Sequence, residues 1–138
     1  MSQPVETFKD VFNRLHGRTL ALLDDLYDAG IVFKDPLHEI QGLPALRRYF
    51  ERLYEGVRHC SFTFEDEVVG EHRAMLTWTM HLEHAGLCRG RRLHLPGASH
   101  IRFADKVQYH RDYFDVGALL YERVPLLGPL VCVIKSRV

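Results

Sequence analysis

The sequence predicts an α+β fold, because the spacing of its apolar residues changes part-way along the chain. Up to about residue 57 they recur at steps of three and four, which is typical of helices with one buried face. From Cys60 onward they recur at steps of two, which is typical of strands. The expected order is helix, helix, short strand, helix and four long antiparallel strands. We therefore expect helices packed on one face of a curved sheet.

The first half of the chain carries the helical pattern. Gly17 can divide its beginning into two helices, and Gly30 is a natural stop for the second one. The short strand follows directly. A further helix begins after Gly42, has Val57 as the last residue of its apolar face and is expected to end at Gly56.

The second half carries the strand pattern. The alternating stretches are residues 60–65, 73–83, 91–103 and 107–115. Pro96 and Gly97 interrupt the third stretch and predict a bulge or bend there. In the last stretch Gln108, His110, Asp112 and Phe114 alternate with Val107, Tyr109, Arg111 and Tyr113. Since either face carries charge, one of them is expected to be functional or paired.

Length and composition indicate one globular domain over residues 1–138, with 46% apolar and 26% charged residues. The formal net charge is zero and the basic residues are scattered apart from a run at 89–92, so we expect no nucleic-acid partner. Three widely spaced cysteines and the lack of a targeting peptide predict reduced thiols in the cytoplasm. The apolar stretch 124–134 contains two prolines and is too short for a membrane span, so we expect it to close the fold or to be buried in a homodimer.

Asp35 lies at the end of the short strand, directly before Pro36. A proline pushes the preceding residue into extended geometry, which fixes the direction of the carboxylate. Alternation places Phe33 and Asp35 on one face, so we expect the carboxylate to lie beside apolar surface. Such burial raises an aspartate pKa above its ordinary value of about 3.9 and makes the group a candidate general base. A plain structural turn is the alternative, because Asp-Pro pairs are common in turns.

Three segments together carry a resemblance: residues 33–36, the helix after Gly42, and the strands that contain residues 100–103 and 109–115. With them the chain resembles the SnoaL-like, ketosteroid isomerase-like branch of the nuclear transport factor 2 (NTF2)-like superfamily, over almost its whole length. The resemblance implies a cone, in which a strongly curved, mostly antiparallel sheet wraps around the N-terminal helices and one further helix and leaves a pocket. Members include isomerases, cyclases, epoxide hydrolases and modules without chemistry, so the fold alone does not name a reaction.

Carried over position by position, Asp35 matches the general-base aspartate of the ketosteroid isomerase-like members. Two other positions depart from that pattern. Val11 and Phe12 stand where the resemblance places a tyrosine, and Ser99 stands where it places a second acid, which is also the acid-base position of the cyclases. The usual oxyanion hole is therefore not matched, and loss of even one such donor typically lowers the rate about a hundredfold.

The resemblance also points His110, Asp112 and Phe114 into the cone, which makes Asp35, His110 and Asp112 the candidate catalytic residues. The candidate pocket residues are Phe12, Phe33, His38, Phe50, Tyr54, Trp78, Met80, Ser99 and Phe114, with His38 near the rim. Two alternatives remain open. Asp112 can pair with an arginine such as Arg102 or Arg111 while His110 is a hydrogen-bonded core histidine, and the aromatic residues can be ordinary core.

Histidines are dense at His81, His84 and His94. Residues three apart on a strand face opposite ways, so His81 and His84 are poorly placed to share an ion. We expect no metal and no cofactor. The leading hypothesis is a protein that binds a small, mostly apolar molecule and uses Asp35 for isomerase-, cyclase- or hydrolase-type chemistry. The alternative is a non-catalytic ligand-binding or dimerisation module of the same fold.

Overall fold

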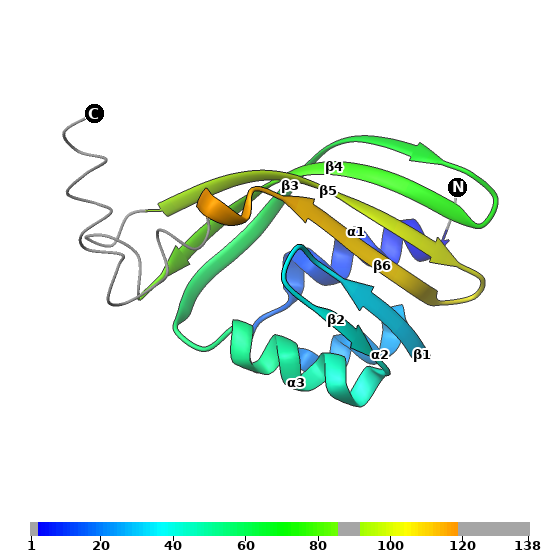
Figure 1. Ribbon diagram of the computed structural model, residues 1–138, viewed down its shortest axis with the longest axis horizontal. Helices are drawn as coiled ribbons and strands as arrows, with labels where there is room; N and C mark the ends of the chain where they lie inside the picture. The colour runs from blue at the N-terminus through cyan, green and yellow to red at the C-terminus, as the bar shows by residue number, and fades with distance from the viewer. Residues whose placement is uncertain (1–2, 86–91, 119–138) are drawn as a thin grey trace.

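The computed structural model describes residues 3–85 and 92–118, which form a curved sheet arching over helices (Figure 1). The helices are α1 (Gln3–Arg14), α2 (Leu23–Leu26) and α3 (Leu43–Leu53), with a short 3-10 helix, η1 (Leu20–Leu22), before α2. None of the described helices is long and apolar enough to cross a membrane.

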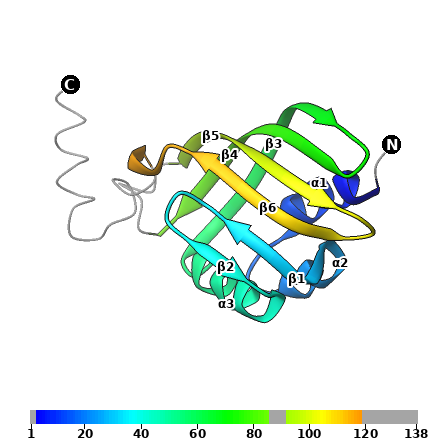
Figure 2. The ribbon, with the colours of Figure 1, turned by 45° about the vertical axis from the view of Figure 1, so that its right-hand side comes forward.

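The sheet has six strands in the spatial order β2-β1-β6-β5-β4-β3. They are β1 (Tyr27–Lys34), β2 (Glu39–Gln41), β3 (Val57–Val69), β4 (Arg73–His84), β5 (Arg92–Phe103) and β6 (Val107–Phe114). β1 and β6 are parallel, and all other neighbours are antiparallel. Figure 2 shows β1 and β2 as a smaller ribbon beside the long strands, close to α3. The expectation of an α+β cone with a mostly antiparallel curved sheet is thus confirmed.

The core lies between the helices and the concave face of the sheet. α1 buries Val5, Phe8, Val11 and Phe12 at helical spacing. β4 buries alternate residues, Ala74, Leu76 and Trp78, while their neighbours Met75 and Thr77 are exposed. In these two elements the buried face is therefore the one that the sequence period predicts.

The second helix ends earlier than expected. α2 stops at Leu26, and Tyr27 is already extended with φ −101° and ψ 141°. Gly30, the expected stop, lies inside β1. The reason is tertiary: Tyr27 is 1% exposed and pairs with Val107 of β6, so burial and strand pairing outweigh the local glycine signal.

The helix after Gly42 is also shorter than expected. α3 ends at Leu53, and Gly56 lies in the turn that follows, with φ +76°. That left-handed conformation favours glycine, so the glycine shapes the turn into β3 and does not end the helix itself. Val57 is accordingly the first residue of β3 and not the last of a helical face.

The expected bulge at Pro96 and Gly97 is absent from the pairing of β5 with β4, which continues there without a shift, Pro96 opposite Thr79 and Gly97 opposite Trp78. The register shifts instead at other places, within the pairs β1–β6, β3–β4 and β5–β6. Between β5 and β6, Arg102 pairs with Tyr109 but Phe103 pairs with Val107. One extra residue, Gln108, is accommodated on β6. Val107 and His110 therefore both face the core, and Gln108 is exposed instead of facing inward.

The C-terminal part of the chain is described only as far as residue 118, and residues 116–118 are helical. The apolar stretch 124–134 is not described at all.

Candidate functional site

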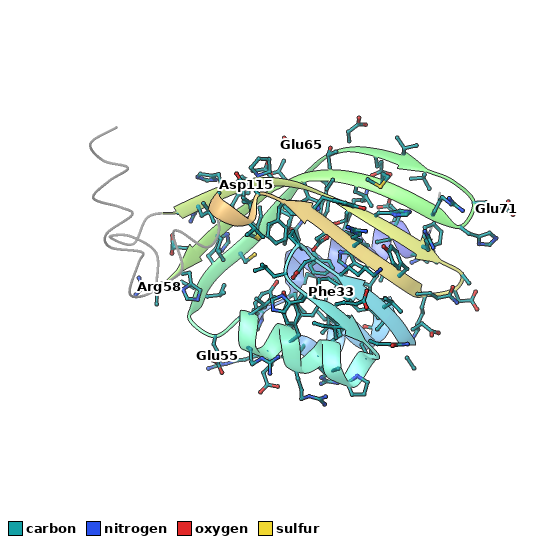
Figure 3. The ribbon with its side chains drawn as sticks, in the orientation of Figure 1. Phe33, Glu55, Arg58, Glu65, Glu71 and Asp115 are labelled. Atoms are coloured by element: carbon teal, nitrogen blue, oxygen red, sulfur yellow. The ribbon has the colours of Figure 1, made fainter. Side chains whose placement is uncertain are left out.

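An apolar cavity of about 120 Å³ opens between α3 and the concave face of the sheet. Figure 3 shows Phe33, one of its wall residues, between α3 and the long strands. The wall is formed by Phe12, Phe33, Asp35, Tyr49, Phe50, Leu53, Tyr54, Val57, Cys60, Phe62, Trp78, Met80, Leu82, Leu95, Asp112 and Phe114. Asp35 and Asp112 are the only Asp, Glu, Lys, Arg or His residues among these described wall residues.

Asp35 is held by a dense set of donors at the end of β1. The backbone N–H groups of Leu37 and His38 each donate to its Oδ1 at 2.8 Å, and His38 Nδ1 lies 3.1 Å from the same oxygen. The hydroxyl of Tyr49, from α3, donates to Oδ2. The Asp35 side chain is only 5% exposed although His38 is half exposed. The carboxylate is thus fixed, almost buried, with one edge on the cavity wall.

Asp112 ends a buried polar network that crosses four strands. Its Oδ1 accepts a hydrogen bond from Ser99 Oγ at 2.5 Å and lies 2.6 Å from His110 Nε2. Trp78 Nε1 donates to Ser99 Oγ at 2.8 Å, and the Tyr27 hydroxyl lies 2.6 Å from His110 Nδ1. His110 is 1% exposed and Asp112 is 21% exposed.

The direction of these hydrogen bonds follows from Tyr27. Burial, and next the charge of Asp112, raise the pKa of its phenol well above the usual 10, so the hydroxyl keeps its proton. That O–H needs an acceptor, and among the described residues the neighbouring group is His110 Nδ1. Nε2 then carries the ring proton and donates it to Asp112. Every donor of the network therefore points toward the Asp112 carboxylate.

Tyr54 and Cys60 form a second polar pair on the wall. Their side chains are hydrogen-bonded to each other. Burial is the main reason that the pKa of Tyr54 lies well above 10, with the charges of Cys60 and Asp112 adding to it. Burial also raises the pKa of Cys60 to about 11, against the lowering effect of the Tyr54 hydrogen bond. Both groups are therefore neutral at pH 7.

Most of the residues proposed from the sequence lie on the cavity wall. These are Asp35, Asp112, Phe12, Phe33, Phe50, Tyr54, Trp78, Met80 and Phe114. Ser99 and His110 instead line a smaller adjoining cavity of about 20 Å³, which shares Phe12, Phe62, Trp78 and Asp112 with the main one. His38 contacts Asp35 from the solvent side and is not on the wall.

Sequence reasoning missed several wall residues, of which Tyr49 is the most consequential because it bonds Asp35. The others are Leu53, Val57, Cys60, Phe62, Leu82 and Leu95. The signal was present: Tyr49 and Leu53 lie on the recognised apolar face of α3, and Cys60, Phe62 and Leu82 alternate with outward residues. The pattern shows which residues face inward, but it does not show which of them lie at the level of the cavity.

The family model that describes a SnoaL-like domain matches residues 6–110. The chain belongs to the SnoaL-like domain family. A comparison of the sequence with curated proteins finds no significant match.

Solved structures share the fold of this SnoaL-like domain at low identity. A putative SnoaL-like polyketide cyclase from Jannaschia sp. CCS1 is 17% identical, with a TM-score of 0.75 over 88% of this chain and 91% of that one. A putative isomerase from Rhodopseudomonas palustris is 20% identical, with a TM-score of 0.76 over 93% and 98%. A protein with a ketosteroid isomerase-like fold from Catenulispora acidiphila, in complex with trimethylamine, is 13% identical, with a TM-score of 0.75 over 89% and 93%.

This SnoaL-like domain departs from the isomerase pattern at two positions, where an acid and a tyrosine are expected. Other residues bring a carboxylate and phenols to the same cavity. Ser99, where the resemblance places an acid, pairs directly across from Asp112 on β6 and is bonded to it. A carboxylate is thus present one strand away. Phe12 stands where the resemblance places a tyrosine, while phenols reach the cavity from Tyr49 and Tyr54.

The alternative left open for His110 and Asp112 of β6 now has an answer in part. The described partners of Asp112 are His110 and Ser99, and no arginine is among them. Arg102 and Arg111 lie on the outer face, where their guanidinium groups stack on Tyr109 and Tyr113 at 4.7 and 4.8 Å. His110 is a hydrogen-bonded core histidine, as one alternative held, but its partner lies on the cavity wall.

His81 and His94 face each other across β4 and β5, with their Nδ1 atoms 2.7 Å apart. His84 instead bonds the backbone oxygen of Glu55. Over residues 3–85 and 92–118, no group of three or more His, Cys, Asp or Glu side chains is placed to hold a metal ion.

Proposed function

We propose that the cavity binds a small, mostly apolar molecule and that Asp35 acts on it as a general base, in chemistry of the isomerase, cyclase or hydrolase type. The observation that carries this proposal is a fixed, nearly buried carboxylate on the wall of a mostly apolar cavity. A base works best when it is held in place and shielded from water, because its proton transfer then competes with little solvent.

Asp35 has a free position for such a transfer. Three described contacts fall on Oδ1, whereas Oδ2 accepts the Tyr49 hydroxyl. A carboxylate oxygen has two lone-pair sites, so Oδ2 retains one for a substrate C–H or for water. The proton taken from carbon would return to another carbon of the same substrate in an isomerisation.

Tyr54 is the proposed donor to the oxygen that gains negative charge. Its hydroxyl stays protonated at neutral pH, because burial raises its pKa well above 10. Its described partner is the Cys60 thiol, and sulfur is a weak acceptor. A substrate carbonyl oxygen would therefore replace the thiol at little cost. This would supply one of the two donors that the isomerase pattern expects.

The structural relatives support a pocket for small molecules. One is described as a putative polyketide cyclase, another as a putative isomerase, and a third holds trimethylamine. At 13 to 20% identity they share the fold, so their activities come to this chain only as a proposal.

The test is turnover by the wild-type chain and by Asp35→Asn of three compounds: 3-cyclohexenone for isomerisation, δ-valerolactone for lactone opening and cyclohexene oxide for hydrolysis. We expect one class to turn over and Asp35→Asn to lower its rate by about 10²- to 10⁴-fold, the usual contribution of a positioned acid or base. Asn keeps the acceptor that the backbone N–H groups of the turn require, so the fold should persist.

Asp105→Asn is the matched control, since Asp105 is an exposed carboxylate in the turn between β5 and β6. It should leave the rate unchanged. Equal turnover by wild type and Asp35→Asn would refute the role of Asp35 as base.

One observation favours the alternative of a non-catalytic binding module. Asp35 Oδ1 accepts hydrogen bonds from two backbone N–H groups of the turn at residues 35–38. An aspartate with a purely structural role makes the same contacts. Saturable quenching of Trp78 fluorescence by these compounds, without turnover of any of them, would establish this alternative.

We also propose a homodimer in a reducing compartment such as the cytoplasm. Val68 and Met75 are cross-strand partners on the outer face of the sheet, 72% and 41% exposed, and Tyr113 on the same face is 44% exposed. Apolar side chains gathered on one face support contact with a second copy, and the free thiol of Cys60 supports reducing conditions. Sedimentation velocity should give a dimer for the wild type and a monomer for Met75→Glu.

A further inference from the structure

The charge of the cavity wall has one sign. Asp35 and Asp112 lie on it, whereas no lysine, arginine or histidine does among the residues that the structure describes. Arg102 of β5 and Arg111 of β6 are on the outer face of the sheet. The wall therefore presents a negative potential to any ligand, and an anionic ligand would be repelled.

Asp112 is the carboxylate with an unused oxygen. His110 and Ser99 both bond Oδ1, and within residues 3–85 and 92–118 no donor bonds Oδ2. The network does not neutralise the carboxylate, because its hydrogen bonds start at neutral Tyr27 and Trp78 and end on Asp112. A partly buried carboxylate with an unpaired oxygen is unfavourable unless a cation or strong donor completes it.

The rest of the wall suits the apolar part of a cation. Phe50, Phe62, Trp78 and Phe114 are among the rings that surround the space beside Asp112. The ring of Phe62 stands perpendicular to that of Trp78, with their centroids 5.3 Å apart, so the space is bounded by ring faces and ring edges. Aromatic faces attract alkylammonium groups through the ring quadrupole, in addition to burying hydrocarbon.

We propose that the ligand of this cavity is a small amine, whose protonated nitrogen donates a hydrogen bond to Asp112 Oδ2 while its hydrocarbon part contacts the aromatic wall. This rests on the proposed function, in that the cavity must bind a small molecule, and it adds the chemical class of that molecule. It requires no turnover and no role for Asp35 as base.

The test compares three probes that share one ring and differ in charge: cyclohexylamine, a cation at pH 7, the neutral donor cyclohexanol, and the anion cyclohexanecarboxylate. Trp78 is the sole tryptophan of the chain and lies on the wall, so its fluorescence reports binding. We expect the amine to bind about ten- to a hundredfold more tightly than the alcohol, the size of a charge-assisted hydrogen bond. The carboxylate should bind most weakly.

Asp112→Asn tests the named partner. It removes the charge and keeps an acceptor for His110 and Ser99, so we expect amine affinity to fall about tenfold or more and alcohol affinity to change by less than about threefold. Asp105→Asn, an exposed carboxylate, should change neither. Should Asp112→Asn fail to fold, the ranking of the three probes on the wild-type protein still decides the matter.

The outcomes separate this inference from the proposed function. Cyclohexanol binding as tightly as cyclohexylamine, or amine affinity unaffected by Asp112→Asn, would overturn the amine while leaving a pocket for neutral molecules. Absence of any fluorescence response to all three probes would overturn both the amine and the binding pocket. Loss of turnover in Asp35→Asn bears only on the catalytic proposal.

Discussion

At the scale of the single residue, the cavity wall depends on a close approach between Trp78 and Gly97. A Cβ at position 97 would lie 2.3 Å from Cη2 and 2.6 Å from Cζ3 of the indole. The indole therefore lies directly on the backbone of β5, and its Nε1 reaches Ser99 two residues on. The glycine that looked like a bulge in the sequence is there to make room for this ring.

Gly97→Ala should consequently destabilise the fold. The added methyl group meets a rigid ring that is itself buried, so we expect the free energy of unfolding to fall by about 1–3 kcal/mol, the usual cost of overpacking. Gly17→Ala is the matched control, because nothing lies within 4 Å of a Cβ there. Urea unfolding of both variants checks this, and equal midpoints would show that the indole moves aside easily.

Cys60 offers a second test at this scale. Since its thiol has a pKa of about 11, raised by burial, we expect peptide-resolved alkylation by iodoacetamide at pH 8 to be slow and to accelerate with pH. Tyr54→Phe removes the hydrogen bond that lowers this pKa and should slow alkylation further. In the unfolded chain the thiol has a pKa near 9.0, so it ionises at lower pH there than in the folded protein. The free energy of unfolding therefore falls as pH rises from 9.0 to about 11. Rapid alkylation at pH 8 would contradict the burial of this group.

At the scale of the elements, α1 is fastened to the edge strand of the sheet. β3 has no strand beyond it in the described sheet, so its outer backbone groups need other partners. Asn13 of α1 accepts the backbone N–H of Phe62 at 2.8 Å. Lys9, one helical turn earlier, pairs with Glu67 at 2.8 Å. Both contacts hold the helix against the strand that carries Cys60 and Phe62 of the cavity wall.

The two contacts should differ in strength. Asn13→Ala leaves a backbone N–H without its acceptor, and we expect a loss of about 1 kcal/mol or more. Lys9→Met removes a partly exposed ion pair that is worth at most about 1 kcal/mol. Because the Glu67 hydrogen bond raises the pKa of Lys9 above 10.5, that smaller contribution is complete below pH 10.5 and is lost as pH rises above it. Urea unfolding at pH 7 and pH 11 measures the stability loss of each variant. If Lys9→Met lost more stability than Asn13→Ala at pH 7, this ranking would be reversed.

Much of this element structure could be predicted from the period of the apolar residues, because α1, α3 and β4 each bury one face. The prediction failed where contacts between distant residues decide. Tyr27 is in a strand because of its partner on β6, and Gln108 faces outward because of a bulge that no local signal marks. These contacts join residues about eighty positions apart or depend on the register of a neighbouring strand.

The candidate site was predictable to a similar degree. Strand alternation placed Phe33 and Asp35 on one face, and the family resemblance pointed Asp112 and Phe114 into the cone. All four lie on the cavity wall. The hydrogen bonds from Tyr49 to Asp35 and from Tyr27 to His110 could not be predicted. Both depend on where α3 and β1 are placed relative to their neighbouring elements, which the sequence pattern does not show.

At the scale of the whole molecule, the buried network ties the sheet into its curved form. Tyr27 at the start of β1, His110 and Asp112 on β6, Ser99 on β5 and Trp78 on β4 are joined by consecutive bonds of 2.5 to 2.8 Å. Polar groups in an apolar core are satisfied only when all these strands lie in the right places. The network therefore couples the wrapping of the sheet to the position of the cavity carboxylate.

Tyr27→Phe tests this coupling, because it removes a single oxygen at nearly constant volume and leaves His110 Nδ1 without its donor. A buried unsatisfied group costs about 1–3 kcal/mol, so we expect urea unfolding to show a loss of that size. Hydrogen exchange should accelerate in β1 and β6 together, since the lost bond joined them. Tyr109→Phe, on the outer face of β6, should change both quantities little, because its ring rather than its hydroxyl contacts Arg102. Should Tyr27→Phe loosen β1 alone while β6 keeps its protection, the strands would be held by backbone pairing, and Asp112 would owe its position to Ser99 instead of to Tyr27 and His110.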